Sequence, residues 1–78
     1  MPSPLFTDRR PAARLGHLIR TTRRDRGLRQ EDLARRASIA TATLRRIEKG
    51  EVTGPSVFVV LRLLTELDLD AGHLRALT

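Results

Sequence analysis

Cysteine is absent from this chain of 78 residues, and aromatic residues make up only 3% of it. Without cysteine, neither a disulfide nor a cysteine-based zinc site can hold the fold together, which fits a cytoplasmic protein. The hydrophobic fraction of 40% is enough for one modest core, near the lower size at which a chain folds unaided. We therefore expect a single domain whose core consists of Leu, Ile, Val and Ala.

Long hydrophobic runs are missing as well. No apolar stretch is long enough to span a bilayer, and the N-terminus lacks the apolar segment of a signal peptide. We therefore expect a cytoplasmic protein with no membrane partner.

The side chains that catalysis or metal binding requires are few and scattered. His17 and His73 lie far apart in the sequence, with no acid or thiol at ligand spacing, and no serine has a histidine in a plausible triad. The five glycines form neither a phosphate-binding loop nor a dinucleotide fingerprint. We expect no enzyme, no cofactor and no metal site.

Arginine, in contrast, is abundant and unevenly placed. The chain has 15 basic and 9 acidic residues, and Lys49 is the single lysine. Residues 1–50 contain 13 basic and 5 acidic side chains, whereas residues 51–78 contain 2 and 4. A GC-rich genome would explain the choice of arginine over lysine, but it would not segregate the charge. The basic part suits a polyanion, because the guanidinium fork matches phosphates and guanine edges.

The pattern of hydrophobic residues predicts an all-α fold of five short helices. Residues 1–11 contain three prolines and no periodicity, so we expect a flexible arm there and a domain over residues 12–78. Arg9 and Arg10 of this arm would either reach a minor groove or belong to a solvated tail. Helical spacing, caps and Gly or Pro punctuation place the helices at residues 11–26, 28–36, 41–49, 56–67 and 71–77.

The second and third predicted helices have the spacing of a helix-turn-helix. They lie in the stretch QEDLARRASIATATLRRIEKG, residues 30–50. Ala34 would be small because the two helices cross beside it, and Ile39 would anchor the turn in the core. Leu44 and Ile47 would point inward from the third helix. The opposite face of that helix would carry Thr41, Ala42, Arg45 and Arg46, whereas Arg35 and Arg36 of the second helix would form a solvated surface.

The longer stretch GLRQEDLARRASIATATLRRIEKGEVTGPS resembles the Cro/CI-type (XRE) helix-turn-helix family. Members typically read G-L-[ST]-Q-x-x-L-A-x-x-x-G-[VI]-S-x-x-x-[IL]-S-x-[IL]-E-x-G, followed by a loop and P-[ST]. The similarity extends from about Leu15 to Leu77. It implies a lambda-repressor-like domain that binds a roughly palindromic operator in double-stranded DNA as a homodimer. Such a protein would act as a repressor or autoregulator.

The resemblance also implies roles for individual residues. Those that face base edges are Thr41, Ala42, Arg45 and Arg46, and Arg46 suits a bidentate contact with guanine. Those near backbone phosphates are Arg29, Gln30, Thr43, Lys49 and Thr53. Arg23 and Glu48 match a structural ion pair between the first and third helices.

Three residues depart from the family pattern. Arg29 and Ala40 occupy N-cap positions at which the family usually has Ser or Thr, and each lost cap costs about 1 kcal/mol. Ser38 replaces a glycine in the turn, where a left-handed conformation is often needed. The turn would then be strained, and the third helix would start at Thr41 with that hydroxyl as its cap.

The fourth predicted helix carries more apolar residues than a core requires. Its inward stripe is expected to be Val57, Val60, Leu61, Leu64 and Leu67, which leaves Phe58 and Val59 as surplus. An apolar surface beyond the needs of the core marks a partner contact. In this family that region often forms the dimer contact. The alternative is an antitoxin that neutralises a toxin through residues 56–69 and represses its own operon.

Overall fold

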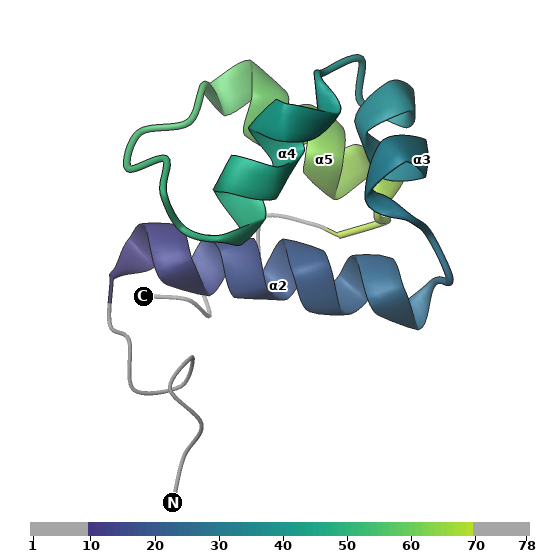
Figure 1. The fold of residues 1–78 in the computed structure, drawn as a ribbon, viewed down its shortest axis with the longest axis horizontal. Helices are drawn as coiled ribbons and strands as arrows, with labels where there is room; N and C mark the ends of the chain where they lie inside the picture. Colours follow the sequence, from purple (N-terminus) through teal and green to yellow (C-terminus); the bar gives the residue numbers. More distant parts are fainter. Residues whose placement is uncertain (1–9, 70–78) are drawn as a thin grey trace, which may run out of the picture.

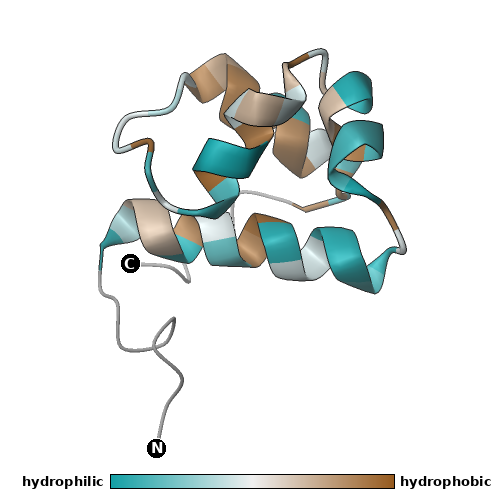
Figure 2. Cartoon of the chain, in the orientation of Figure 1, coloured by the Kyte–Doolittle hydropathy of each residue, from teal (hydrophilic) through white to brown (hydrophobic). Residues whose placement is uncertain are grey.

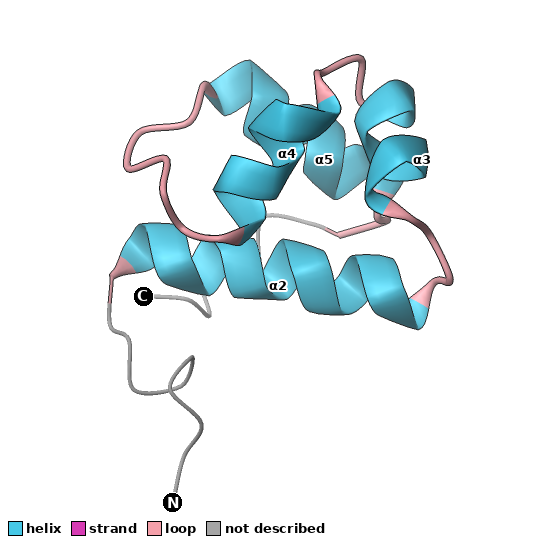
Figure 3. Ribbon diagram, in the orientation of Figure 1, coloured by secondary structure: helices cyan, strands magenta, loops and turns pink. Residues whose placement is uncertain are grey.

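The computed structural model describes residues 10–69, which form four α-helices without a strand (Figures 1 and 3). The helices are α2 (Pro11–Asp25), α3 (Gln30–Arg36), α4 (Thr41–Glu48) and α5 (Val57–Glu66). The predicted all-α class is confirmed, whereas the expected fifth helix at residues 71–77 and most of the expected arm lie outside the described residues.

The helix boundaries follow the predictions closely, with one larger shift. α2 begins at Pro11, whose missing N–H costs nothing at the first helical position. α3 begins at Gln30 rather than at Leu28. Leu28 belongs to the preceding turn, because its N–H donates to the carbonyl of Arg23 at 3.1 Å and ends α2.

All four described helices end in the same hydrogen-bonded turn. After α3, the Ile39 N–H donates to the Ala34 carbonyl at 2.9 Å, and the Ser38 N–H donates to the Arg35 carbonyl at 3.1 Å. This pair of bonds is the Schellman motif, and it requires a left-handed residue just past the helix. The residues in that conformation are Gly27, Ser38, Gly50 and Asp68.

Ser38 is strained at this position, because it is not a glycine and its φ is 58°. The left-handed conformation expected for this turn is therefore present. We predict that Ser38→Gly raises the free energy of unfolding by about 0.5 to 1 kcal/mol, since glycine lacks the Cβ that makes this conformation costly. Urea denaturation measures the change. Ser56→Gly is the control, because Ser56 has a φ of −56° and glycine there should only destabilise.

All four described helices contribute to the hydrophobic core, and α2 runs along one side of the other three (Figure 1). α4 packs against both α2 and α3, and α3 also contacts α5. Small residues of α3 and its C-cap, Ala34 and Ala37, are only 1% exposed, so the helices on either side of them approach closely. The buried cluster consists of Ile19, Leu33, Ala34, Ala37, Leu44, Ile47, Leu63 and Leu67.

The buried face of α5 differs from the one predicted (Figure 2 shows how hydrophobic this helix is). Leu64 and Leu67 are buried as expected, and Leu63 is buried with them. Val57 and Leu61 are 69% and 52% exposed, so the prediction that they point inward is wrong. The reason is the rotation of the helix about its axis, which only its packing against α3 and the core decides.

Three apolar side chains of α5 therefore face outward. Phe58 is 74% exposed, as its assignment to a surplus surface requires. Leu61 follows Phe58 by three residues and Val57 by four, so it lies next to both on the helix surface. Val59, the other residue assigned to that surface, is half-buried and packs against the core. We call Val57, Phe58 and Leu61 the outer apolar patch.

Within residues 10–69, no helix combines the length and the apolar character that crossing a membrane requires.

Candidate nucleic-acid interface

The helix-turn-helix consists of α3, a turn over residues 37–40, and α4. Ile39 is half-buried and packs against the core from within the turn. Leu44 and Ile47 pack α4 against the core, with exposures of 0% and 3%. The orientation of α4 is therefore determined by its own buried face, and its remaining residues are presented to the outside.

The outward face of α4 carries small residues first and cationic ones after them. Thr41 is half-buried, and the exposed residues that follow are Ala42, Thr43, Arg45, Arg46 and Lys49. The helix therefore has a thin N-terminal edge followed by a row of long basic side chains. That shape and charge suit entry into the major groove of DNA.

The N-terminus of α4 has no side-chain cap. Ala40 is the N-cap residue, with φ −68° and ψ 142°, and Thr41 is the first helical residue. The helix therefore starts at Thr41 as predicted, but the prediction that the Thr41 hydroxyl caps it is wrong. The side chain of Thr41 remains available for contacts outside the helix.

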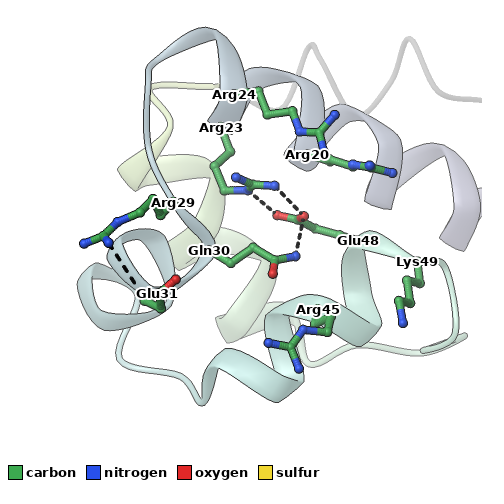
Figure 4. Close-up of a pocket in the computed structure, with 9 residues that line it drawn as sticks. All are labelled: Arg20, Arg23, Arg24, Arg29, Gln30, Glu31, Arg45, Glu48 and Lys49. Carbon is green, nitrogen blue, oxygen red and sulfur yellow. Dashed lines mark hydrogen bonds and ion pairs between the residues drawn. The ribbon is translucent and has the colours of Figure 1, made fainter.

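A buried ion pair joins α2 to α4 (Figure 4). Arg23 Nε donates to Glu48 Oε2 at 2.8 Å, and Arg23 Nη2 donates to Glu48 Oε1 at 3.0 Å. The side chains are 8% and 2% exposed. Arg23 Nη1 also donates to the carbonyl of Leu28 at 2.9 Å, and Gln30 Nε2 donates to Glu48 Oε1 at 3.1 Å. The sequence-based pairing of Arg23 with Glu48 thus corresponds to a direct contact, to which Gln30 is added.

The N-terminus of α3 is closed by an acidic side chain instead of the usual cap. The Arg29 N–H donates to Asp32 Oδ2 at 3.0 Å, and Arg29 Nε donates to the same oxygen at 3.3 Å. The backbone hydrogen bond is the main reason that the pKa of Asp32 lies below its ordinary value, and the guanidinium adds to it. In turn, the hydrogen bond to Asp32 raises the pKa of Arg29. Asp32 thus compensates in part for the missing Ser or Thr.

One pocket, of about 440 Å³, gathers many of these residues (Figure 4). Of the residues assigned to the site from the sequence, it includes Arg23, Arg29, Gln30, Arg45, Glu48 and Lys49. The sequence reasoning missed Arg20 and Arg24, which also line the pocket. Their spacing of four along α2 was the signal available, because it places both on one face of the helix.

The other assigned residues lie outside this pocket. Thr41, Ala42, Thr43 and Arg46 belong to α4, whereas Thr53 is exposed in the loop between α4 and α5. Among residues 10–69, no three His, Cys, Asp or Glu side chains are grouped so that they could hold a metal ion.

The fold and this basic surface together define a helix-turn-helix domain, a DNA-binding module that is typically non-enzymatic. The chain belongs to the helix-turn-helix domain family, whose model matches residues 14–77. This match confirms the resemblance to the XRE type. No curated protein and no solved structure matches the chain. Membership in this family indicates binding to double-stranded DNA and a role in transcription regulation.

Proposed function

We propose that the protein is a sequence-specific transcriptional regulator, a repressor or autoregulator, which binds a roughly palindromic operator as a homodimer. The observation that carries this proposal is the exposed face of α4, which is small at its N-terminal edge and basic beyond it. In a helix-turn-helix protein this helix enters the major groove, and two copies read half-sites about one helical turn apart.

Within this proposal, residues on the outward face of α4 read the bases, and residues around that face contact the DNA backbone. Arg46 forms a bidentate contact with guanine, Arg45 lies at the border of bases and backbone, and Thr41 and Ala42 approach thymine methyl groups. Both arginines are exposed, and neither has an ion-pair partner among the described residues. The backbone phosphates fall to Arg29, Gln30, Thr43, Lys49 and Thr53.

Selection of bound sequences from random duplex DNA tests the proposal directly. We expect enrichment of a motif with two-fold symmetry, because each copy of the dimer reads the same half-site. Enrichment of an asymmetric motif would contradict the symmetric dimer. If no motif were enriched, the proposal of sequence-specific binding would be wrong.

We predict that Arg46→Ala relaxes specificity at one operator position. The loss of a bidentate contact with guanine removes about 1–3 kcal/mol of discrimination at that base pair. Binding of wild-type and variant protein to a set of single-base operator variants measures it.

Lys49→Gln is the matched control for this measurement, because Lys49 is exposed at the C-terminal end of α4 and is assigned to a phosphate. This variant should bind all sequences more weakly to the same extent and lower the salt slope by about 1. If Arg46→Ala weakened binding equally for every sequence, the assignment of Arg46 to base reading would fail.

The outer apolar patch supports the homodimer. Phe58, Val57 and Leu61 form one exposed apolar face on α5, whereas most of the described surface is polar or charged. We predict that Phe58→Glu shifts the protein from dimer to monomer, because a second copy would bring two carboxylates together at the two-fold axis. Sedimentation equilibrium measures the mass. Thr21→Glu, an equally acidic change at an exposed position on α2, should leave the dimer intact.

The same patch favours one alternative, an antitoxin that binds a toxin and represses its own operon. Burying Phe58 against a different protein would satisfy the exposed apolar surface equally well. A dimer that persists in Phe58→Glu would remove this residue from the dimer contact and favour the alternative. A toxin gene beside this one would support it further.

A further inference from the structure

The pocket between α2, α3 and α4 is strongly cationic (Figure 4). Six basic side chains line it, against the two carboxylates of Glu31 and Glu48 and the amide of Gln30. The basic side chains are Arg20, Arg23, Arg24, Arg29, Arg45 and Lys49. Such an excess of one charge in a concave site raises the local concentration of ions of opposite sign.

Part of this charge is neutralised within the protein. Arg23 is bound by both oxygens of Glu48. Arg29 pairs with Asp32 at 3.3 Å and lies 4.0 Å from Glu31. Glu48 is thus fully engaged by Arg23, whereas the exposed Glu31 is the one carboxylate of the pocket that is only weakly paired.

Four cations remain after these pairs are counted. No carboxylate among the described residues lies within ion-pair distance of Arg20, Arg24, Arg45 or Lys49. The first two extend from α2, Arg45 extends from α4 and Lys49 from its C-cap, so these cations line the pocket from two sides (Figure 4). Gln30 also lines the pocket; it gives one N–H to Glu48 and retains a second N–H donor.

We propose that this pocket binds a phosphate group, with Arg20 and Arg24 of α2 as binding residues that the helix-turn-helix itself does not supply. Guanidinium groups suit this ligand, because their planar donors match phosphate oxygens in a bidentate manner. The volume of about 440 Å³ leaves room for a phosphate together with its neighbouring groups.

The bound phosphate group could belong to one of two ligands. One is a phosphodiester of the operator flanking the groove that α4 enters, and this source rests on the proposed function. The other is a free oligophosphate, whose binding would compete with DNA for Arg45 and Lys49.

The test compares Arg20→Gln/Arg24→Gln with Arg26→Gln/Arg36→Gln in the full chain. All four arginines are exposed, and the control pair neither lines the pocket nor enters a described ion pair. Both variants lose two positive charges, so the net charge of the protein changes by the same amount in each. Thermal unfolding establishes first that both are folded.

The first arm titrates inorganic tripolyphosphate into the protein without DNA, followed by calorimetry. Saturable binding that is at least tenfold weaker in the Arg20/Arg24 variant and within twofold of wild type in the control supports a free oligophosphate. An equal loss in both variants would overturn the pocket as a tripolyphosphate site. Because no DNA is present, this arm succeeds or fails independently of the proposed function.

The second arm measures duplex binding over a range of salt concentrations. If the DNA backbone is the source, the Arg20/Arg24 variant binds all sequences more weakly and its salt slope falls by about 2, whereas the control remains near wild type. Absence of saturable tripolyphosphate binding together with equal effects of both variants on DNA would overturn the proposal. A wild-type protein that binds tripolyphosphate but selects no DNA motif would contradict the proposed function alone.

Discussion

Glu48→Gln is expected to lower the free energy of unfolding by about 3 to 5 kcal/mol, because it leaves the Arg23 guanidinium buried without a counter-charge. Both side chains lie almost entirely out of water, and the carboxylate accepts two hydrogen bonds from Arg23 and one from Gln30. Glutamine has the same shape, but it replaces one of the two acceptor oxygens with a donor.

The expected loss is large relative to the stability of a small domain, which is about 5 to 15 kcal/mol. Urea denaturation measures it. Glu31→Gln is the matched control, because Glu31 lies in the same pocket with its side chain 60% exposed and 4.0 Å from Arg29. An exposed pair of this kind contributes little, so the control should change stability far less.

A double variant separates the charge from the packing. Arg23→Met/Glu48→Met removes both charges and fills similar space, so it should recover part of the stability that Glu48→Gln loses. The recovery is incomplete, because the Leu28 carbonyl and the Gln30 amide lose their partners. If Glu48→Gln proved as stable as wild type, water would reach the ion pair more readily than its low exposure indicates.

The sequence predicted the helices well because their signals are local. Proline at the start of α2, glycine after α2 and α4, and the spacing of Leu44 and Ile47 act within one helical turn. The left-handed turn at Ser38 was instead implied by the resemblance, because the family usually has glycine there. In the structure, two hydrogen bonds to α3 carbonyls define this turn.

The errors and omissions have a tertiary origin. α5 is apolar on more than one side, so its sequence is compatible with several rotations, and contacts with α3 and the core select the one that exposes Val57 and Leu61. Likewise, nothing within α2 shows that Arg20 and Arg24 line a pocket. That depends on where α3 and α4 lie against α2.

Gly16→Ala is the second substitution with a large expected effect, and it acts on the contact that positions α4. A Cβ at residue 16 would meet the Ile47 carbonyl oxygen closer than any real contact, and the Glu48 carbonyl oxygen at 2.7 Å. These are backbone atoms in the last turn of α4, so no side-chain movement relieves the overlap. α2 and α4 would have to separate.

We expect this separation to lower the free energy of unfolding by about 3 kcal/mol. Helix propensity alone predicts the opposite change, because it favours Ala over Gly by about 1 kcal/mol within a helix. Gly54→Ala is the control, because a Cβ at that position meets nothing within 4 Å, and the variant should be neutral or slightly more stable. Stabilisation by Gly16→Ala would mean that propensity outweighs packing and that α2 does not approach α4 this closely. The expected loss would instead show that the absence of a side chain at residue 16 on α2 sets the position of α4.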